Sequence, residues 1–176
     1  MARCEKVLIA GFSGSGKSSL LSTLAESAST GWKFLDLDQF LLDQNPVFST
    51  IQELIEALGW EKFRLLERQG IEAFLKSEGK GVLALGGGAF NPLLWQLYGA
   101  HPKIKFCHLS APFEVCWQRI INDVNEPRPL ALKGKASLKE LFDTRASVYQ
   151  LIPWRIENNG NQSLTMLAHE FWSELE

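Results

Sequence analysis

The stretch GFSGSGKSSL, residues 11–20, follows directly on the apolar run VLIA at residues 7–10. It matches the phosphate-loop pattern G-x-x-x-x-G-K-[ST]. In such a loop, glycines let successive backbone N–H groups point at phosphate oxygens, and the helix that follows adds its positive end. We expect the side chain of Lys17, as an exposed loop residue, to reach the β- and γ-phosphates and the Ser18 hydroxyl to ligate Mg²⁺. The predicted nucleotide-binding residues of the loop are Ser13, Gly14, Ser15, Gly16, Lys17, Ser18 and Ser19.

Two carboxylates, Asp36 and Asp38, follow the second apolar run of the chain. Side chains two residues apart on a strand point to the same side, and strand carboxyl ends in open α/β sheets face the ligand crevice. One carboxylate could help hold the Mg²⁺ shell, which we assign to Asp36, and the other could accept a hydrogen bond from a substrate hydroxyl. The alternative is a pair of solvent-facing carboxylates at a strand end.

A run of three glycines and two separate arginines are candidates for holding a second substrate. Gly86, Gly87 and Gly88 follow the third apolar run and leave no side chains over that strand end, so a ligand can lie on backbone amides. Arg64 and Arg145 lie in helical patterns beside apolar neighbours, where a guanidinium offers a planar fork for a carboxylate. The alternatives are a flexible turn for the glycines and a surface ion pair for either arginine.

Short apolar runs that alternate with helical patterns must position these residues. This alternation predicts an α/β fold with a parallel sheet covered by helices on both faces. Strands are expected at residues 6–10, 33–37, 81–85, 104–108 and 154–157.

Helix starts are predicted from capping patterns. Residues 49–52 (STIQ) and 137–140 (SLKE) match a capping box, Asn91 precedes a proline, and a last helix is expected at about residues 163–175.

Residues 121–137 are polar, contain two prolines and join two helical patterns, which is typical of a functional loop or lid. A disordered surface loop is the alternative for this segment.

The composition of the 176 residues suits one globular domain, with 45% hydrophobic residues and a net charge of −2. The 18 basic residues are scattered, which argues against a nucleic-acid or anionic-membrane partner. The apolar runs are too short to cross a bilayer, and the first residues lack the apolar segment of a signal peptide. Three cysteines without metal-ligand spacing are expected to be free thiols, as in a cytoplasmic protein.

In chain order, these motifs resemble those of the shikimate kinase family over about residues 7–149. The resemblance rests on the loop 11–18, Asp36 and Asp38, Phe63-Arg64 with Glu67, Gly86 to Gly88, Arg128-Pro129-Leu130, and Arg145 four residues before Tyr149. It implies a three-layer kinase fold with a five-stranded parallel sheet and a mobile lid at about residues 121–137. It also implies phosphorylation of the 3-hydroxyl of shikimate by ATP with Mg²⁺, a step toward chorismate and the aromatic amino acids, by a monomer.

The resemblance further implies a role for each matching residue. Asp38 would bind the acceptor hydroxyl and act as base, beside Lys17 and Arg128 as the other catalytic residues. Arg128 would close over the phosphates with the lid, and Arg119 would lie near the adenine. The substrate carboxylate would be held by Arg64 and Arg145, and its ring by the amides of Gly86, Gly87 and Gly88.

The chain departs from the family pattern at three places. Gly59 is followed by Trp60, where the family commonly has an acid, and Asp123, Glu126 and Pro127 stand in the lid where glycines are usual. The late arginine near the adenine is missing, and Asn161 and Gln162 lie in that region.

Two other kinds of protein remain open as alternatives. A gluconate-kinase-like or other small phosphate-loop kinase also acts on hydroxyls, and gluconate carries a carboxylate. A nucleotide-binding regulatory module without turnover is the second alternative. The sequence has no guanine-reading Asn-Lys-x-Asp motif, which argues against a GTP-dependent switch.

Overall fold

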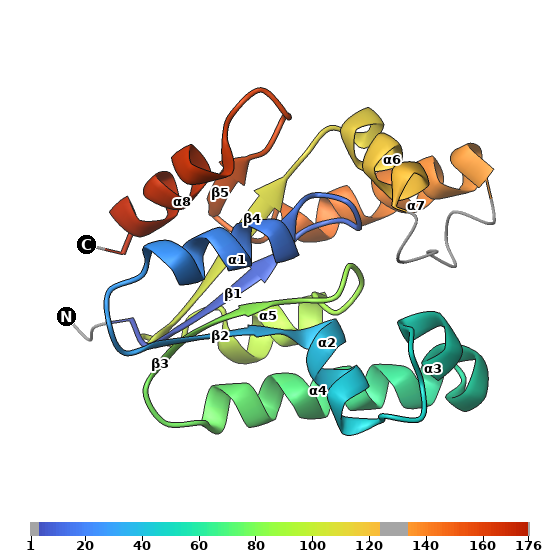
Figure 1. Cartoon of the computed structure of the whole chain (residues 1–176), viewed down its shortest axis with the longest axis horizontal. Coiled ribbons are helices and arrows are strands. Elements are labelled where there is room, and N and C mark those ends of the chain that lie inside the picture. The colour runs from blue at the N-terminus through green and yellow to red at the C-terminus, as the bar shows by residue number, and fades with distance from the viewer. Residues whose placement is uncertain (1–3, 124–133, 176) are drawn as a thin grey trace.

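The computed structural model describes residues 4–123 and 134–175, and its centre is a five-stranded parallel sheet (Figure 1). The strand order across the sheet is β2-β3-β1-β4-β5, with every neighbouring pair parallel. Because all strands run the same way, their carboxyl ends share one edge of the sheet. The strands are β1 (Lys6–Ala10), β2 (Trp32–Asp36), β3 (Lys80–Ala84), β4 (Ile104–Ser110) and β5 (Trp154–Glu157).

The predicted α/β fold with five parallel strands is therefore confirmed, with small shifts at strand ends. The second strand stops at Asp36, one residue earlier than predicted, and the fourth continues to Ser110. The first shift matters for the site, because Leu37, predicted as the last strand residue, begins a helix that also contains Asp38.

Helices cover both faces of the sheet, as its continuously apolar strands require. Val7 and Ile9 of β1 face a core made with α1 (Lys17–Ser27) and α8 (Leu164–Ser173). The remaining helices are α2 (Leu37–Gln44), α3 (Ile51–Leu58), α4 (Trp60–Lys76), α5 (Pro92–Tyr98), α6 (Phe113–Asn122) and α7 (Gly134–Tyr149). The opposite face packs mainly against α4, α5, α6 and α7, which gives the three layers seen in Figure 1.

Helix starts follow local capping chemistry, with two corrections to the prediction. Asn91 caps α5, since its Oδ1 accepts the N–H of Leu94 at 2.9 Å, and Pro92 occupies the first turn as expected. The box at residues 49–52 is displaced by one position, because the capping side chain of α3 is that of Thr50. The box at 137–140 is wrong, since α7 already begins three residues earlier, at Gly134.

The ends of the predicted lid are helical. α6 continues to Asn122 and α7 begins at Gly134, so residues 121–122 and 134–137 belong to helices. Residues 124–133, with the predicted catalytic Arg128, lie outside the described residues.

Cys4, Cys107 and Cys116 are free thiols, as predicted, and burial raises the pKa of Cys116 to about 11. In residues 4–123 and 134–175, no helix is both long and apolar enough to cross a membrane.

Candidate active site

The phosphate loop joins β1 to α1 at the carboxyl edge of the sheet. Gly14 and Gly16 have φ angles of +78° and +97°, a left-handed conformation that residues with a Cβ rarely adopt. These two glycines turn the loop so that α1 starts at Lys17 with its N-terminal N–H groups directed at the loop.

Two side chains hold the loop from behind. Arg119 Nη1 donates to the carbonyls of Gly14 and Ser15, both at 3.2 Å. Asn158, buried at the end of β5, donates from Nδ2 to the Ser15 carbonyl at 2.8 Å and accepts from Arg119 Nη2 at 3.2 Å. The family resemblance predicted Arg119 near the adenine, and the structure shows that its guanidinium braces the loop. Asn158 was missed, because a single asparagine at a strand end carries no motif.

Lys17 is not the exposed loop residue that the sequence predicted. It is the first residue of α1, its exposed fraction is 8%, and its Nζ donates to the carbonyls of Gly11 at 2.9 Å and Phe12 at 3.0 Å. These bonds hold the ammonium group over the loop, where phosphate oxygens would lie.

Ser18 and Asp36, the predicted metal ligands, are in contact. The Ser18 hydroxyl donates to Asp36 Oδ2 at 2.6 Å, while Asp36 Oδ1 accepts from the N–H groups of Asp38 at 3.0 Å and Gln39 at 3.4 Å. A hydroxyl and a carboxylate oxygen are the hard ligands that Mg²⁺ prefers. The described residues contain no cluster of three or more His, Cys, Asp or Glu that could hold a metal ion.

Asp38 reaches the site from a helix, which corrects the predicted strand geometry. Because Asp36 caps α2, the chain turns at once and Asp38 lies in the first helical turn. The two carboxylates nevertheless line one cavity of about 620 Å³. The predicted residues that line it are Gly14, Gly16, Lys17, Ser18, Ser19, Asp36, Asp38, Gly87 and Arg119. Ser13 and Ser15, also predicted, are buried within the loop.

Two guanidinium groups converge on Gly88. A methyl group placed on this glycine would lie 2.5 Å from Nη2 of Arg64, on α4, and 2.7 Å from Nη2 of Arg145, on α7. The site can accept these forks only because residue 88 has no side chain. Two donors converging on one point suit a single planar carboxylate.

A buried carboxylate balances part of this positive charge. Glu67 forms an ion pair with Arg64, and its own exposed fraction is only 3%. Burial raises the pKa of the Glu67 carboxyl, against the opposing effect of Arg64 and Arg145, and burial also lowers the pKa of Arg145. The sequence contained Glu67 only as part of a motif and gave it no role; its burial beside Arg64 identifies it as a positioning residue.

The glycine run contributes a carbonyl to the site. The Gly87 oxygen accepts from Arg145 Nη1 at 2.5 Å and from the Tyr149 hydroxyl at 2.9 Å. Because Tyr149 is buried, its pKa is raised to about 12, so the hydroxyl stays protonated and acts as a donor. Tyr149 was a spacing marker in the sequence, and here it helps to orient Arg145.

Gly86 lies between the phosphate-loop cavity and the residues around Arg64. A methyl group on Gly86 would lie 2.8 Å from Asp38 Oδ1 and 2.8 Å from Glu67 Oε1. Asp38 therefore borders both the phosphate-loop cavity and the group of residues around Arg64.

Trp60, which departs from the family pattern, stacks on an arginine of the site. Its ring centroid lies 5.1 Å from the guanidinium carbon of Arg64 and makes an edge contact with Phe63 at 6.1 Å. A cation–π contact of this kind stabilises the planar fork in one orientation. Trp60 thus helps to hold the Arg64 side chain in place.

Known proteins resemble this chain along most of its length. The profile of the family described as "Shikimate kinase" matches residues 13–176. The shikimate kinase of Persephonella marina is 30% identical over 156 residues, which cover 89% of this chain and 90% of the relative. That of Lactococcus lactis is 33% identical over 144 residues, covering 81% of each chain. The solved structure of shikimate kinase from Acinetobacter baumannii in complex with shikimate has a TM-score of 0.82 at 26% identity and covers 98% of this chain and 93% of that chain.

The fold and the site define a class. A parallel sheet, a phosphate loop before α1 and an acceptor side lined by arginines describe a small-molecule kinase of the phosphate-loop type, which uses ATP. Within that class, the match of the family profile to nearly the whole chain is decisive. The chain belongs to the shikimate kinase family.

Proposed function

We propose that this protein transfers the γ-phosphoryl group of ATP to the 3-hydroxyl of shikimate, with Mg²⁺ as cofactor. The observation that carries the proposal is the convergence of Arg64 and Arg145 on Gly88, beside a carboxylate that borders the phosphate-loop cavity. The complex of the Acinetobacter baumannii relative with shikimate supports the choice of acceptor.

The two arginines support one orientation of the acceptor. Arg64 and Arg145 would bind the shikimate carboxylate from two sides, with Glu67 and the Gly87 carbonyl fixing the guanidinium groups. The ring would then extend across Gly86 toward Asp38, which places a hydroxyl beside the carboxylate of Asp38.

The chain would catalyse transfer by positioning and by neutralising charge. The acceptor oxygen forms a bond to the γ-phosphorus, the bond from that phosphorus to the bridging oxygen of ADP breaks, and the hydroxyl proton passes to Asp38. Lys17 would turn from the loop carbonyls to the phosphates. Ser18 and Asp36 would hold Mg²⁺, which neutralises phosphate charge when bound. A catalytic role for Arg128 rests on the family resemblance.

The alternatives differ in what they leave unexplained. A gluconate-type kinase would also need a carboxylate site, but family membership favours shikimate. A nucleotide-binding module without turnover has no need of a carboxylate site next to Asp38 and Lys17. A single domain and a cytoplasmic location remain our proposals from the composition of the chain, and a monomeric state remains one from the family resemblance.

A coupled assay of ADP release with shikimate, with and without Mg²⁺, tests the proposed function. We expect turnover only when ATP, Mg²⁺ and shikimate are all present, with a product whose phosphorus couples to the proton on carbon 3 in NMR spectra. Turnover without Mg²⁺, or a phosphate on another hydroxyl, would contradict the assignment.

Arg145→Lys keeps the charge of the site but removes the planar fork. The loss of one charge-assisted contact costs about 1.5–3 kcal/mol, so the KM for shikimate should rise about 10- to 100-fold while that for ATP changes little. Steady-state kinetics measure both constants, and Arg68→Lys, an exposed arginine of α4, is the matched control. If only the KM for ATP rose, Arg145 would belong to the nucleotide site.

Gly88→Ala should separate the two guanidinium groups without removing either. The new methyl group would lie 2.5 Å from Arg64 and 2.7 Å from Arg145, closer than real Cβ contacts allow, so both side chains must move. We expect the KM for shikimate to rise at least about tenfold, as for the loss of one good contact, with an unchanged ATP affinity. An unaltered shikimate KM in a folded variant would refute the convergence as the carboxylate site.

A further inference from the structure

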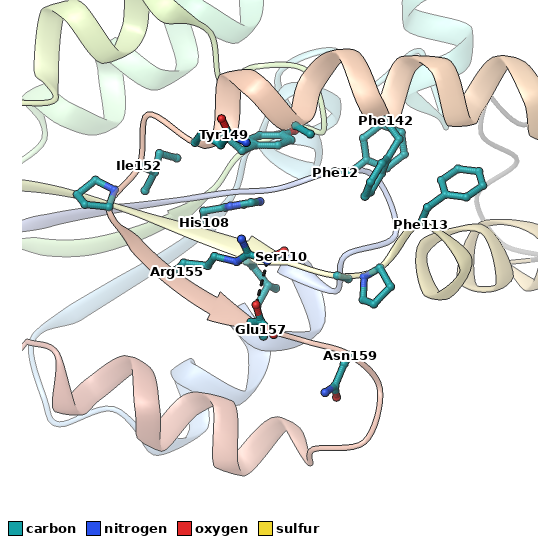
Figure 2. Close-up of a pocket in the computed structure, with 16 residues that line it drawn as sticks. Phe12, His108, Ser110, Phe113, Phe142, Tyr149, Ile152, Arg155, Glu157 and Asn159 are labelled. Carbon is teal, nitrogen blue, oxygen red and sulfur yellow. Dashed lines mark ion pairs between the residues drawn. The ribbon is translucent and has the colours of Figure 1, made fainter.

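A second cavity, of about 560 Å³, lies between α7 and the carboxyl ends of β4 and β5 (Figure 2). It shares no lining residue with the cavity around Lys17 and Ser18. Its volume falls within the roughly 300–1,000 Å³ of small-molecule sites in proteins. Among its polar lining side chains, only Tyr149 also serves the acceptor site, through the bond from its hydroxyl to the Gly87 carbonyl.

Two groups of aromatic rings line this cavity. Phe12 and Phe113 both pack against Phe142, with ring centroids 5.0 Å and 5.5 Å apart and edge-on geometry. Tyr149, on the same helix as Phe142, stacks on His108 of β4 at 4.7 Å, with an angle of 17° between the planes. Figure 2 shows these rings on both sides of the open space, an arrangement that suits a flat apolar group.

His108 adds a flat ring but no charge at neutral pH. Burial lowers its pKa to about 4, with further lowering by the positive charges of Arg155 and Lys17. The inner part of the cavity therefore presents neutral surfaces to a ligand.

A pair of opposite charges lies on the strand below the rings. Arg155 and Glu157, both on β5, form an ion pair at 2.9 Å, with 53% and 66% of their side-chain surfaces exposed. An ion pair this exposed contributes only about 0–1 kcal/mol, so its members can exchange partners at little cost. A simple anion would be attracted by Arg155 but repelled by Glu157. A simple cation would be attracted by Glu157 but repelled by Arg155. A ligand with both charges satisfies both residues.

We propose that this cavity is a second small-molecule site, and that its ligand is a zwitterion with a flat apolar body, namely an aromatic α-amino acid. The aromatic ring lies between Phe142 and the stacked rings of Tyr149 and His108. The α-carboxylate pairs with Arg155 and the α-ammonium group pairs with Glu157.

Isothermal titration calorimetry of the full chain with L-phenylalanine tests the proposal without any kinase assay. Glycine, N-acetyl-L-phenylalanine and L-phenylalanine amide remove the ring, the ammonium group and the carboxylate in turn. We expect one-to-one binding of L-phenylalanine and at least about fivefold weaker binding of each analogue, from the loss of a charged contact or of the buried ring. No binding of L-phenylalanine, or equal binding of any analogue, would overturn the proposal.

Variants then locate the site. Arg155→Gln and Glu157→Gln change exposed residues, and each should weaken L-phenylalanine binding at least about fivefold, whereas Arg68→Gln should not. Unchanged binding in both β5 variants would place the ligand elsewhere and refute the assignment. With saturating shikimate the stoichiometry should stay at one to one. An apparent Kd that grows in proportion to shikimate concentration would show one shared site and would equally overturn the proposal.

Discussion

Asp38→Asn is expected to lower kcat for shikimate phosphorylation by about 10²- to 10⁴-fold, the usual contribution of a general base. The substitution preserves the shape of the side chain beside Gly86 but removes the carboxylate that we propose takes the hydroxyl proton. Because Asp36, not Asp38, caps α2, the helix itself should remain intact. Steady-state and single-turnover kinetics measure the loss, and thermal unfolding checks the fold.

Asp43→Asn is the matched control, since Asp43 lies on the same helix, is exposed, and accepts a hydrogen bond from the Gln39 side chain at 2.8 Å. It should retain wild-type turnover. A kcat for Asp38→Asn within about twofold of wild type would show that Asp38 is not the base.

Lys17→Met is expected to lower kcat by about 10²- to 10³-fold, the loss that follows removal of one preorganised donor from developing negative charge. Methionine keeps most of the buried volume of the lysine stem, which matters because only 8% of Lys17 is exposed. The substitution also removes the ammonium group that donates to the carbonyls of Gly11 and Phe12, so some loss of stability should accompany the kinetic effect.

Lys76→Met, at an exposed ion pair with Glu72 on α4, separates this effect from a general loss of positive charge. The control should keep full activity. If Lys17→Met turned over shikimate at the wild-type rate, the loop would not be the catalytic phosphate site.

The parallel sheet and most of the site were predictable because they depend on local patterns. Buried strands are continuous apolar runs, and the phosphate loop needs glycines at fixed positions, so both are legible in a single sequence. The same reasoning found Arg64, Arg145 and the three glycines, although only the fold shows that a missing Cβ at residue 88 lets two guanidinium groups meet.

The parts that sequence reasoning missed depend on contacts between distant segments. Asn158 lies 143 residues along the chain from Ser15, whose carbonyl it binds, and no sequence periodicity predicts a hydrogen bond over that separation. Glu67 became informative only when its burial was known. The geometry of Asp36 and Asp38 was wrong because an aspartate at a strand end also caps helices, and here capping prevailed.

The specificity of the acceptor site tests the central claim most directly. The measurement is kcat/KM for ADP release with shikimate, shikimate methyl ester, gluconate and AMP, in the presence of ATP and Mg²⁺. Arg64 and Arg145 are proposed to bind a carboxylate on a ring whose hydroxyl meets Asp38. The kcat/KM for shikimate should then exceed that for each other compound by at least about 100-fold, because each of them loses two charged contacts or the ring geometry. Equal turnover of gluconate, or of the ester that lacks the charge, would contradict the account.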